Sequence, residues 1–318
     1  MKNKWFLLGF LPILLTSCSE NVKSIESKIF GFGTYAEIKL YEGDKTNVED
    51  IENIFYQYDK LSDNYLERDI ENVYSINQTN DEVTISSELY QMLEKSFNVA
   101  NEGATYFNPL CGSLAKKWKE ALDAKEVLSD SVIAEELEKM NNSSLTFLNN
   151  NHVKRNGLAE IDLGAIAKGY TLDIVKNYLE ENNIHQYLIN AGSSSLLLGE
   201  KKSKDGLFSV GLKDIKNAYL KLKNCFVSTS AISEQNAKID GVTYSHIVNP
   251  LTGSSVCEND GVIVVSETGY FGDALSTSMM MNTVEEIQTL ENDLNVKVIV
   301  IKNKQITYRN EDLKVYYH

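Results

Sequence analysis

The chain has 318 residues, with 42% hydrophobic and 24% charged side chains, and its formal net charge is −14 at pH 7. Such an acidic surface repels nucleic acid and anionic lipid headgroups, so it excludes both as electrostatic partners. A chain of this length can form one large domain or two small ones with a hydrophobic core. Four cysteines without a CxxC spacing support neither a zinc site nor a disulfide framework. We interpret Cys111, Cys225 and Cys257 as buried thiols, and pairing of Cys225 with Cys257 stays open.

Residues 1–17 have the pattern of a bacterial lipoprotein signal peptide. Lys2 and Lys4 form a positive start, an apolar run follows from Trp5 to Leu15, and small residues precede Cys18. The apolar run is too short to serve as a permanent membrane span. A plain secretory peptide with an incidental cysteine is the alternative interpretation.

Cleavage before Cys18 predicts a lipidated cysteine, a tether over residues 18–27 and one folded domain over residues 28–318. The mature chain would carry a formal charge of −16, because both charges in the removed peptide are positive. Its anchor would then be the lipid and not electrostatic attraction. We expect the protein on the extracytoplasmic, periplasmic side of the bacterial cell membrane.

The first elements of the domain show strand and helix patterns in turn. Residues 28–41 predict a strand, and their Gly-Phe-Gly-Thr segment allows close approach by a ligand or, alternatively, marks a flexible edge strand. Apolar residues at helical spacing predict helices over 48–60 and 86–100, with a loop from Leu61 to Asn77 after the first. An exposed aromatic ring in that loop, such as Tyr65, can stack on a flat heterocycle or simply fill a gap.

The next part of the chain mixes helix and strand signals. An extended piece over residues 105–118 turns at Pro109 into a short helix. The acidic segment 119–140 favours helix, and we interpret it as a solvated excursion without chemistry. Residues 144–154 and 160–163 predict strands around an Asn-rich turn.

The stretch from Glu160 to Asp173 is predicted to organise the molecule. A short β-like run passes through Gly164 into a helix with one apolar side. A strand-to-helix turn directs backbone N–H groups and the positive end of the helix dipole toward one point, which suits a phosphate. Lys168 adds a positive charge one turn into the helix, and Asp162 offers an oxygen acceptor. The alternative is an ordinary strand–helix junction with a glycine for clearance.

The sequence pattern in the second half of the chain predicts mainly short strands, with a hairpin around Asn303 and Lys304 at the end. Strands are expected over 186–190, 196–198, 207–212, 218–222, 225–230, 261–266, 296–301 and 304–309. Ser228 to Ser230 end one strand in hydroxyl groups, and His246 lies beside a Pro-x-Thr-Gly turn. A histidine in such polar surroundings is a candidate catalyst or, alternatively, a structural residue of the core.

A helix is predicted to open at Asp273 after the strand 261–266. Asp273 and Thr277 project from the same helix face because they are four residues apart. A carboxylate and a hydroxyl on adjacent turns suit Mg²⁺, which keeps several waters and takes few protein ligands. An N-cap aspartate with a threonine bonded back to the helix is the alternative interpretation.

Four segments stand in the order and rough spacing of one known family. Three of them are Ile-Asp-Leu-Gly-Ala-Ile-Ala-Lys-Gly-Tyr at 161–170, Ser-His-Ile-Val-Asn-Pro-Leu-Thr-Gly at 245–253 and Asp-Ala-Leu-Ser-Thr at 273–277. They resemble the ApbE-type FAD:protein FMN transferases, a family with many lipoproteins. The fourth, Phe-Asn-Pro-Leu-Cys-Gly-Ser-Leu-Ala-Lys-Lys-Trp at 107–118, is similar to that family's Phe-Asp-x-Thr-x-Gly-Pro-Leu-x-x-x-Trp. The resemblance runs from about Gly31 to Met281 and implies an α+β fold related to the T-fold, with mixed sheets, flanking helices and a FAD cleft between two subregions.

Carried over position by position, the resemblance implies two groups of site residues. Mg²⁺ would be held by the main-chain carbonyl of Ala165 and the side chains of Asp273 and Thr277, with Ser276 close by. FAD would contact a larger group, with His246 at the pyrophosphate: Phe32, Asn64, Tyr65, Phe107, Asn108, Pro109, Asp162, Lys168 and His246.

The resemblance implies Mg²⁺-dependent transfer of FMN from FAD to a Thr or Ser hydroxyl of an acceptor protein. His246 or Asp273 would take the hydroxyl proton, the oxygen would attack the FMN phosphorus, and AMP would leave. The expected acceptors are subunits of membrane redox complexes. Two alternatives stay open: a Mg²⁺-dependent FAD pyrophosphatase, in which water replaces the acceptor, and a non-enzymatic lipid-anchored FAD-binding protein.

The chain departs from the pattern of the family in three places. Asn108 replaces an aspartate and so removes a charge from the adenosine side, and Ser-Thr-Ser-Ala at 228–231 replaces Ala-Thr-Ser-Gly. Asn64, followed by Tyr65, stands where the transferases usually carry a stacking tyrosine. Loss of that tyrosine would favour hydrolysis of FAD over transfer.

Overall fold

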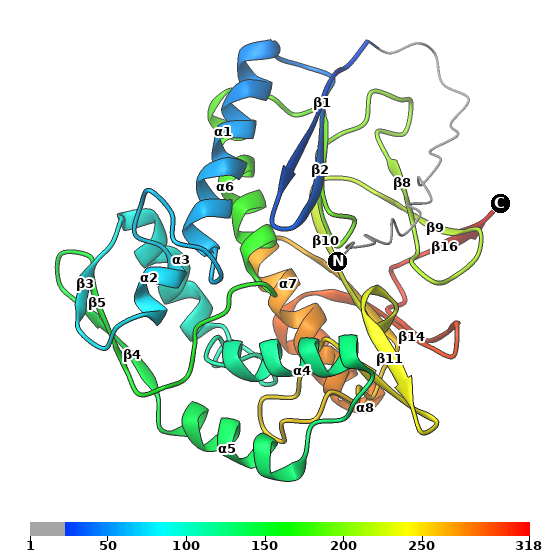
Figure 1. Ribbon diagram of the computed structural model, residues 1–318. Helices are drawn as coiled ribbons and strands as arrows, with labels where there is room; N and C mark the ends of the chain where they lie inside the picture. The colour runs from blue at the N-terminus through cyan, green and yellow to red at the C-terminus, as the bar shows by residue number, and fades with distance from the viewer. Residues whose placement is uncertain (1–22) are drawn as a thin grey trace, which may run out of the picture.

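The computed structural model describes residues 23–318. The predicted signal peptide, Cys18 and the first part of the tether lie outside these residues. Within residues 23–318, no helix combines the length and the apolar composition that a bilayer crossing requires. The α+β class, with mixed sheets and flanking helices, is confirmed (Figure 1).

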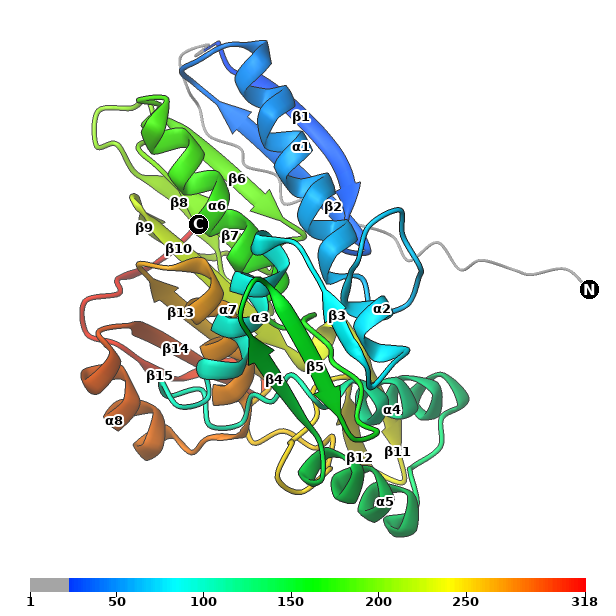
Figure 2. The same cartoon turned by 90° about the vertical axis from the view of Figure 1, so that its left-hand side faces the viewer.

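An eight-stranded antiparallel sheet forms the centre of the molecule (Figure 2). Its strand order is β1-β2-β6-β7-β10-β13-β14-β15, so strands far apart in the sequence become neighbours. The six residues of β13 are all buried, because this strand lies inside the sheet and both of its faces are covered. The strands are β1 (Ile25–Gly31), β2 (Thr34–Leu40), β6 (Tyr187–Ala191), β7 (Ser195–Leu198), β10 (Cys225–Ala231), β13 (Gly261–Ser266), β14 (Lys297–Lys302) and β15 (Gln305–Arg309).

Three helices cover one face of this sheet. The first two, α1 (Lys45–Ser62) and α6 (Ala167–Glu181), run side by side, and α7 (Gly269–Ser278) packs against the first turns of α6 (Figure 1). Apolar residues at helical spacing meet the inward residues of the strands, and each buried side chain stabilises the fold by about 1.5–3 kcal/mol. This layer includes Ile38, Ile51, Phe55, Leu172, Val175 and Ile189.

The opposite face of the main sheet packs against a three-stranded sheet. It consists of β8 (Phe208–Gly211), β9 (Ala218–Leu222) and β16 (Val315–Tyr317). Apolar residues of both sheets form a separate core, including Leu198, Phe208, Leu220, Val227, Ile263 and Ile299. The sequence patterns missed one helix in this half, α8 (Val284–Leu294), which precedes β14.

A second subregion stands beside the main sheet and contributes the other side of the molecule (Figures 1 and 2). The predicted helix over 86–100 is confirmed there as α3, and the predicted short helix after Pro109 is longer, α4. A two-stranded ribbon and two 3₁₀ turns complete the structure. The elements are α2 (Val73–Asn77), β3 (Glu82–Thr84), α3 (Ser87–Asn98), α4 (Gly112–Ala124), α5 (Asp130–Asn141), β4 (Ser144–Leu148), β5 (His152–Asn156), η1 (Ile232–Glu234), β11 (Asn236–Ile239), β12 (Val242–Ser245) and η2 (Met279–Met281).

The predicted single strand over residues 28–41 is wrong, because a tight turn divides it into β1 and β2. Phe32 and Gly33 form this turn with φ values of 53° and 69°. A phenylalanine rarely adopts positive φ. Here the carboxylate of Asp59 on α1 accepts a hydrogen bond from the backbone N–H of Phe32 at 2.5 Å and holds the turn.

Two further expectations around the predicted site are wrong. Residues 160–163 form no strand: the N–H of Asp162 donates to the carbonyl of Pro109 at 2.8 Å, and no sheet continues there. Asp273 does not open a helix, because α7 begins four residues earlier at Gly269. Asp273 therefore lies in the second turn and is not the N-cap.

The segment 119–140 is largely helical, as predicted, and mostly exposed, but it also makes contacts that the prediction of a solvated excursion missed. It forms the end of α4 and most of α5, and the buried carboxylate of Glu136 forms an ion pair with Lys117 on α4 at 3.1 Å. On α5, Ile133 fills the space beside Gly253, where a Cβ atom would overlap it. This acidic segment therefore supports the Pro-x-Thr-Gly turn that follows His246.

Candidate active site

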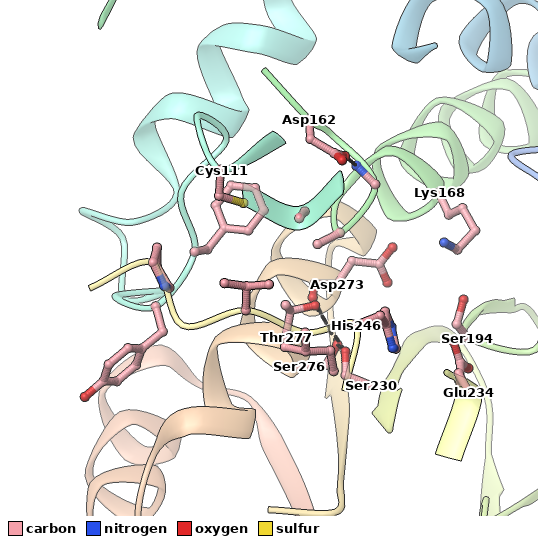
Figure 3. Close-up of a pocket in the computed structure, with 18 of the residues that line it drawn as sticks. Cys111, Asp162, Lys168, Ser194, Ser230, Glu234, His246, Asp273, Ser276 and Thr277 are labelled. Atoms are coloured by element: carbon pink, nitrogen blue, oxygen red, sulfur yellow. Dashed lines mark hydrogen bonds between the residues drawn. The ribbon is translucent and has the colours of Figure 1, made fainter. Parts of the chain in front are cut away.

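A cavity of about 220 Å³ opens between the main sheet and the second subregion (Figure 3). Its lining comes from distant parts of the chain: the segment before α4, the turn into α6, the ends of β7 and β10, the turn after β12, and α7. The structure brings nine of the predicted site residues together here: Phe107, Asn108, Asp162, Ala165, Lys168, His246, Asp273, Ser276 and Thr277.

Asp273 is the most buried charged residue of the cavity. Its side chain is buried, and both carboxylate oxygens accept hydrogen bonds from the hydroxyl of Ser195 at 2.8 Å. Oδ1 also accepts from the hydroxyl of Ser228 at 2.6 Å, and Oδ2 accepts from the backbone N–H of Gly169 at 2.7 Å. Donors from β7, β10 and α6 thus fix one carboxylate of α7.

The environment of Asp273 acts on its pKa in two directions. Burial is the largest effect and raises the pKa above the usual value, because the charged form loses its hydration. The positive charge of Lys168, the hydroxyls of Ser228 and Ser195 and the N–H of Gly169 act against this. A cation placed against a buried carboxylate stabilises the charged form, which has lost its hydration.

Lys168 points toward the same part of the cavity as Asp273 (Figure 3). The α6 terminus beneath it does not offer all its N–H groups to an anion, as the turn had predicted. The N–H groups of Ile166 and Ala167 donate to the carbonyl of Leu163 at 3.0 and 2.8 Å. That of Gly169 donates to Asp273. Lys168 is therefore the main positive group that this turn supplies.

Three hydroxyl groups cluster beside Asp273 at the end of β10 and on α7. The hydroxyl of Ser230 lies 3.0 Å from that of Ser276 and 3.1 Å from that of Thr277. Among residues 23–318, no three His, Cys, Asp or Glu side chains are placed to hold a metal ion. A donor set of one carboxylate with hydroxyl oxygens fits Mg²⁺, a hard cation that takes few protein ligands. The hydroxyls of Ser195 and Ser228 can rotate, so Asp273 can turn lone pairs to such an ion.

His246 also lines the cavity and directly follows β12. Its Nδ1 is 3.2 Å from the carbonyl oxygen of Gln235. Because a carbonyl only accepts, Nδ1 carries the proton in the neutral ring and Nε2 is left as an acceptor. Burial lowers the pKa of His246, the charge of Lys168 adds to this effect, and the Gln235 carbonyl and the Glu234 carboxylate oppose it. The ring is therefore neutral at pH 7 and can act as a base.

Four predicted site residues do not line this cavity: Phe32, Asn64, Tyr65 and Pro109. Phe32 packs at the β1–β2 turn against Phe55 on α1, with ring centroids 6.3 Å apart. Asn64 is buried, and its Nδ2 has no hydrogen-bond partner. Tyr65 is 53% exposed; burial is the largest effect on its pKa and raises it, and the negative charge of Asp162, which lines the cavity, adds to the rise.

The predicted site residues leave out several polar residues of this region, and three of them contact or neighbour Asp273 or His246. Ser195 and Ser228 hold Asp273 from two neighbouring strands, and Glu234 lines the cavity beside His246. The run of hydroxyls at the end of β10 was a usable signal for Ser228. Ser195 is revealed only by the pairing of β7 with β10, and Glu234 only by the folding of η1 beside the cavity, because neither residue belongs to a recognisable motif.

The three cysteines within residues 23–318 are free thiols. Cys225 and Cys257 are thus unpaired, which answers the question left open by the sequence. Burial raises the pKa of Cys111 to about 12, and Cys111 lines the cavity. A thiol of this kind is a poor nucleophile at neutral pH.

Comparison with known proteins gives this arrangement a context. The sequence model of the ApbE family matches residues 32–300. The FAD:protein FMN transferase of Klebsiella pneumoniae is 27% identical over 266 residues, which are 78% of this chain and 79% of that protein. The FAD:protein FMN transferase of Treponema pallidum is 26% identical over 218 residues, and this match spans 62% of the chain but only 60% of that protein's length.

Two solved structures have the same fold. The ApbE protein of Thermotoga maritima gives a TM-score of 0.75 at 24% identity and covers 93% of this chain and 97% of its own. The flavinyl transferase ApbE of Pseudomonas stutzeri, in its apo form, gives a TM-score of 0.76 at 18% identity, with 91% and 95% covered. Because the family model covers most of the domain and the fold agrees along nearly the whole chain, this protein belongs to the ApbE family.

Proposed function

We propose that this protein is an enzyme that transfers FMN from FAD to a Thr or Ser hydroxyl of an acceptor protein and releases AMP. The observation that carries the proposal is the cavity that unites Asp273, Lys168 and His246 with a cluster of hydroxyl groups. The names of the relatives from Klebsiella pneumoniae and Treponema pallidum support the same reaction.

The charges of the cavity suit a dinucleotide diphosphate. FAD carries two negative charges on its phosphates, and Lys168 supplies a positive charge on the wall of the cavity. We propose that Asp273, Thr277 and the carbonyl of Ala165 hold Mg²⁺ there, with Ser276 next to them. A magnesium ion bound at these groups would offset the charge that builds up on the phosphate oxygens.

His246 is the residue best suited to the proton transfer. The proton of the acceptor hydroxyl moves to Nε2, because Nδ1 already donates toward the Gln235 carbonyl. The acceptor oxygen then forms a bond to the FMN phosphorus, and the bond from this phosphorus to the bridging oxygen breaks. AMP leaves with the bridging oxygen, and the acceptor keeps FMN through a phosphoester.

One incubation separates this function from its two alternatives. The protein is mixed with FAD, Mg²⁺ and a flexible peptide that carries a single Thr, and with the same peptide carrying Val instead. Flavin fluorescence bound covalently to the Thr peptide alone supports transfer. Release of AMP without labelling supports a FAD pyrophosphatase, and intact FAD in every tube supports a protein that only binds the flavin.

We propose further that Cys18 carries a lipid and holds the enzyme at the extracytoplasmic side of the membrane, where subunits of redox complexes would be its acceptors. The pattern of residues 1–18 supports this. Growth of the producing cells with a labelled fatty acid tests it. Label in the wild type and none in the Cys18→Ala variant is the expected result, and equal labelling contradicts it.

A further inference from the structure

The two helices of the active site carry the same short pattern at their contact. Gly-Tyr-x-x-Asp occurs at 169–173 on α6 and again at 269–273 on α7. In each copy, glycine and aspartate are four residues apart, so both lie on the same helix face. The second aspartate is Asp273 of the cavity, whereas the first, Asp173, does not line it.

The two patterns bind each other reciprocally. The backbone N–H of Gly169 donates to Oδ2 of Asp273 at 2.7 Å, and the backbone N–H of Gly269 donates to Oδ1 of Asp173 at 2.7 Å. The N–H of Tyr270 donates to Oδ2 of Asp173 at 2.8 Å. Each helix thus supplies a carboxylate to amides of the other, and we call these four residues, Gly169, Asp173, Gly269 and Asp273, the reciprocal clamp.

The glycines of the clamp bring the two backbones into direct contact. A Cβ atom on Gly169 would overlap the carbonyl oxygen of Gly269, and a Cβ atom on Gly269 would overlap that of Gly169. No side chain separates the helices here, so any change of the clamp moves the backbone of one helix against the other. Lys168 and Thr277 are carried by these same two helices.

Asp173 replaces the usual cap at the start of α7. Thr268 occupies the N-cap position, yet its side chain makes no capping hydrogen bond. The first amides of a helix need acceptors, and a carboxylate there is favoured by the helix dipole. Asp173 supplies it from another helix, so the position of α7 depends on α6.

Retaining a charged group at this place has a cost. Burial raises the pKa of Asp173 to about 6, and the neighbouring negative charge of Asp273 adds to this rise. The two amides of α7 and the ammonium of Lys176 act in the opposite direction. An apolar residue with a Thr cap would avoid the charge, so the arrangement calls for a reason beyond stability.

We propose that Asp173 is a positioning residue for flavin transfer: through the reciprocal clamp it fixes α7 against α6 and so sets the position of Asp273 relative to Lys168. The inference rests on the proposed function, because it takes these two groups to act on the same diphosphate and its cation. A cation bound at Asp273 also removes the repulsion between the two carboxylates, so ligand binding and the clamp strengthen each other.

The first test is the Asp173→Asn variant of the full domain. An amide keeps one acceptor oxygen but turns an NH₂ group toward a backbone donor, so one half of the clamp opens. The matched control is Glu291→Gln on α8, where another buried carboxylate accepts a backbone N–H, that of Val298 at 2.6 Å, away from the cavity. Quenching of FAD fluorescence measures the affinity for FAD, and repeating it over a range of Mg²⁺ concentrations measures how that affinity depends on the metal. Thermal unfolding measures the stability of each variant.

We expect Asp173→Asn to raise the Mg²⁺ concentration at half-maximal FAD binding by about tenfold, with excess Mg²⁺ restoring binding. Glu291→Gln lowers the melting temperature but leaves that concentration unchanged. Equal Mg²⁺ dependence in wild type and Asp173→Asn overturns the inference. Wild-type protein that binds FAD but labels no peptide refutes the transfer reaction and leaves the clamp standing, whereas wild type that binds no FAD refutes both.

Hydrogen exchange of the wild type keeps the inference testable if Asp173→Asn does not fold. The amides of Gly269 and Tyr270 are expected to exchange slowly, and more slowly still when FAD and Mg²⁺ are added together. Exchange of these amides that does not change on adding both ligands contradicts the coupling.

Discussion

Two regions around the cavity hold their polar groups in different ways. The wall, formed by Lys168, Asp273, Ser276 and Thr277, belongs to two helices in backbone contact, and Asp273 there accepts hydrogen bonds from three other residues. The rim, formed by Asn64 and Tyr65, belongs to a loop after α1. There Nδ2 of Asn64 is buried without a partner, and the ring of Tyr65 is half exposed.

Under the proposed function, this difference would separate the groups that act in the reaction from those that recognise the flavin. A group that acts on charge in the reaction must be fixed before the substrate arrives, which requires a rigid and fully satisfied surrounding. A loop that covers a large flat ligand can adjust to it, and an unpaired amide gains a partner only when something binds. We therefore expect substitutions in the wall to affect turnover and the Mg²⁺ dependence of FAD binding, and substitutions in the rim to affect FAD affinity alone.

The largest effect is expected for Asp273→Ala. The change removes the one carboxylate in the donor set proposed for Mg²⁺ and also leaves the N–H of Gly169 without its acceptor. Release of AMP from FAD should fall by about 10³-fold or more, as for the loss of a main electrostatic group. Asp312→Ala, which removes an exposed carboxylate paired with Lys297, should leave the rate unchanged. Normal turnover of the Asp273 variant would remove the proposed metal site.

His246→Ala comes second and tests the base. Loss of a general base slows a reaction by about 10²–10⁴-fold, while FAD affinity should stay close to that of the wild type. The exposed His185 provides the control, His185→Ala. AMP formation at wild-type speed in His246→Ala would assign the base elsewhere, with Asp273 the next candidate.

The same residue predicts the pH dependence of turnover. Burial lowers the pKa of His246 below 6.5, so the base stays unprotonated at pH 7 and the rate should fall only as the pH drops below that lowered value. The unfolded chain takes up this proton at a higher pH than the folded one, so acid also lowers stability in this range. A pH–rate profile of wild type and His246→Ala shows whether the acid limb disappears with the ring.

A smaller effect is expected at Trp118 on α4, beneath the turn that follows His246. Its Nε1 donates to the carbonyl of Gly253 at 2.8 Å, and its ring stacks on Tyr244 with centroids 5.6 Å apart. Trp118→Phe keeps an aromatic ring and loses the hydrogen bond, at a cost of about 1 kcal/mol. We expect the melting temperature to fall by about 2–4 °C. Turnover should fall several-fold, because the turn after His246 loses a support. Unchanged melting would show that the turn does not depend on this bond.

Much of the fold could be predicted from local patterns. Amphipathic spacing indicated α1 and α3 because each buries one face against a large core, and the C-terminal hairpin was evident from its alternation and its Asn-Lys turn. The turn at Phe32 was hidden, since its residue type disfavours the conformation and the carboxylate that holds it lies on α1. Long-range contacts of this kind leave no local trace.

The residues of the site likewise divide into those that local motifs predict and those that only long-range contacts place. The motifs around Asp162, Lys168, His246 and Asp273 pointed to residues that the structure does place around one cavity. The partners of Asp273 could not be predicted, because Ser195 reaches it only through the pairing of β7 with β10. The role of Asp173 was equally hidden: its partners are backbone amides 96 and 97 residues away, and an amide carries no sequence signal.

The smallest predicted effect concerns the rim. The ring of Tyr65 faces the ammonium groups of Lys116 and Lys119, at 4.9 and 5.7 Å from its centroid, so it is held by cation–π contacts rather than by a core. Tyr65→Ala should weaken FAD binding by about threefold to tenfold, the range of a single stacking contact, and leave the rate at saturating FAD unchanged. Tyr56→Ala, an exposed tyrosine of α1, is the control. A loss of turnover at saturating FAD in Tyr65→Ala alone would mean that the rim also orients the reacting phosphate, and the division between wall and rim would have to be abandoned.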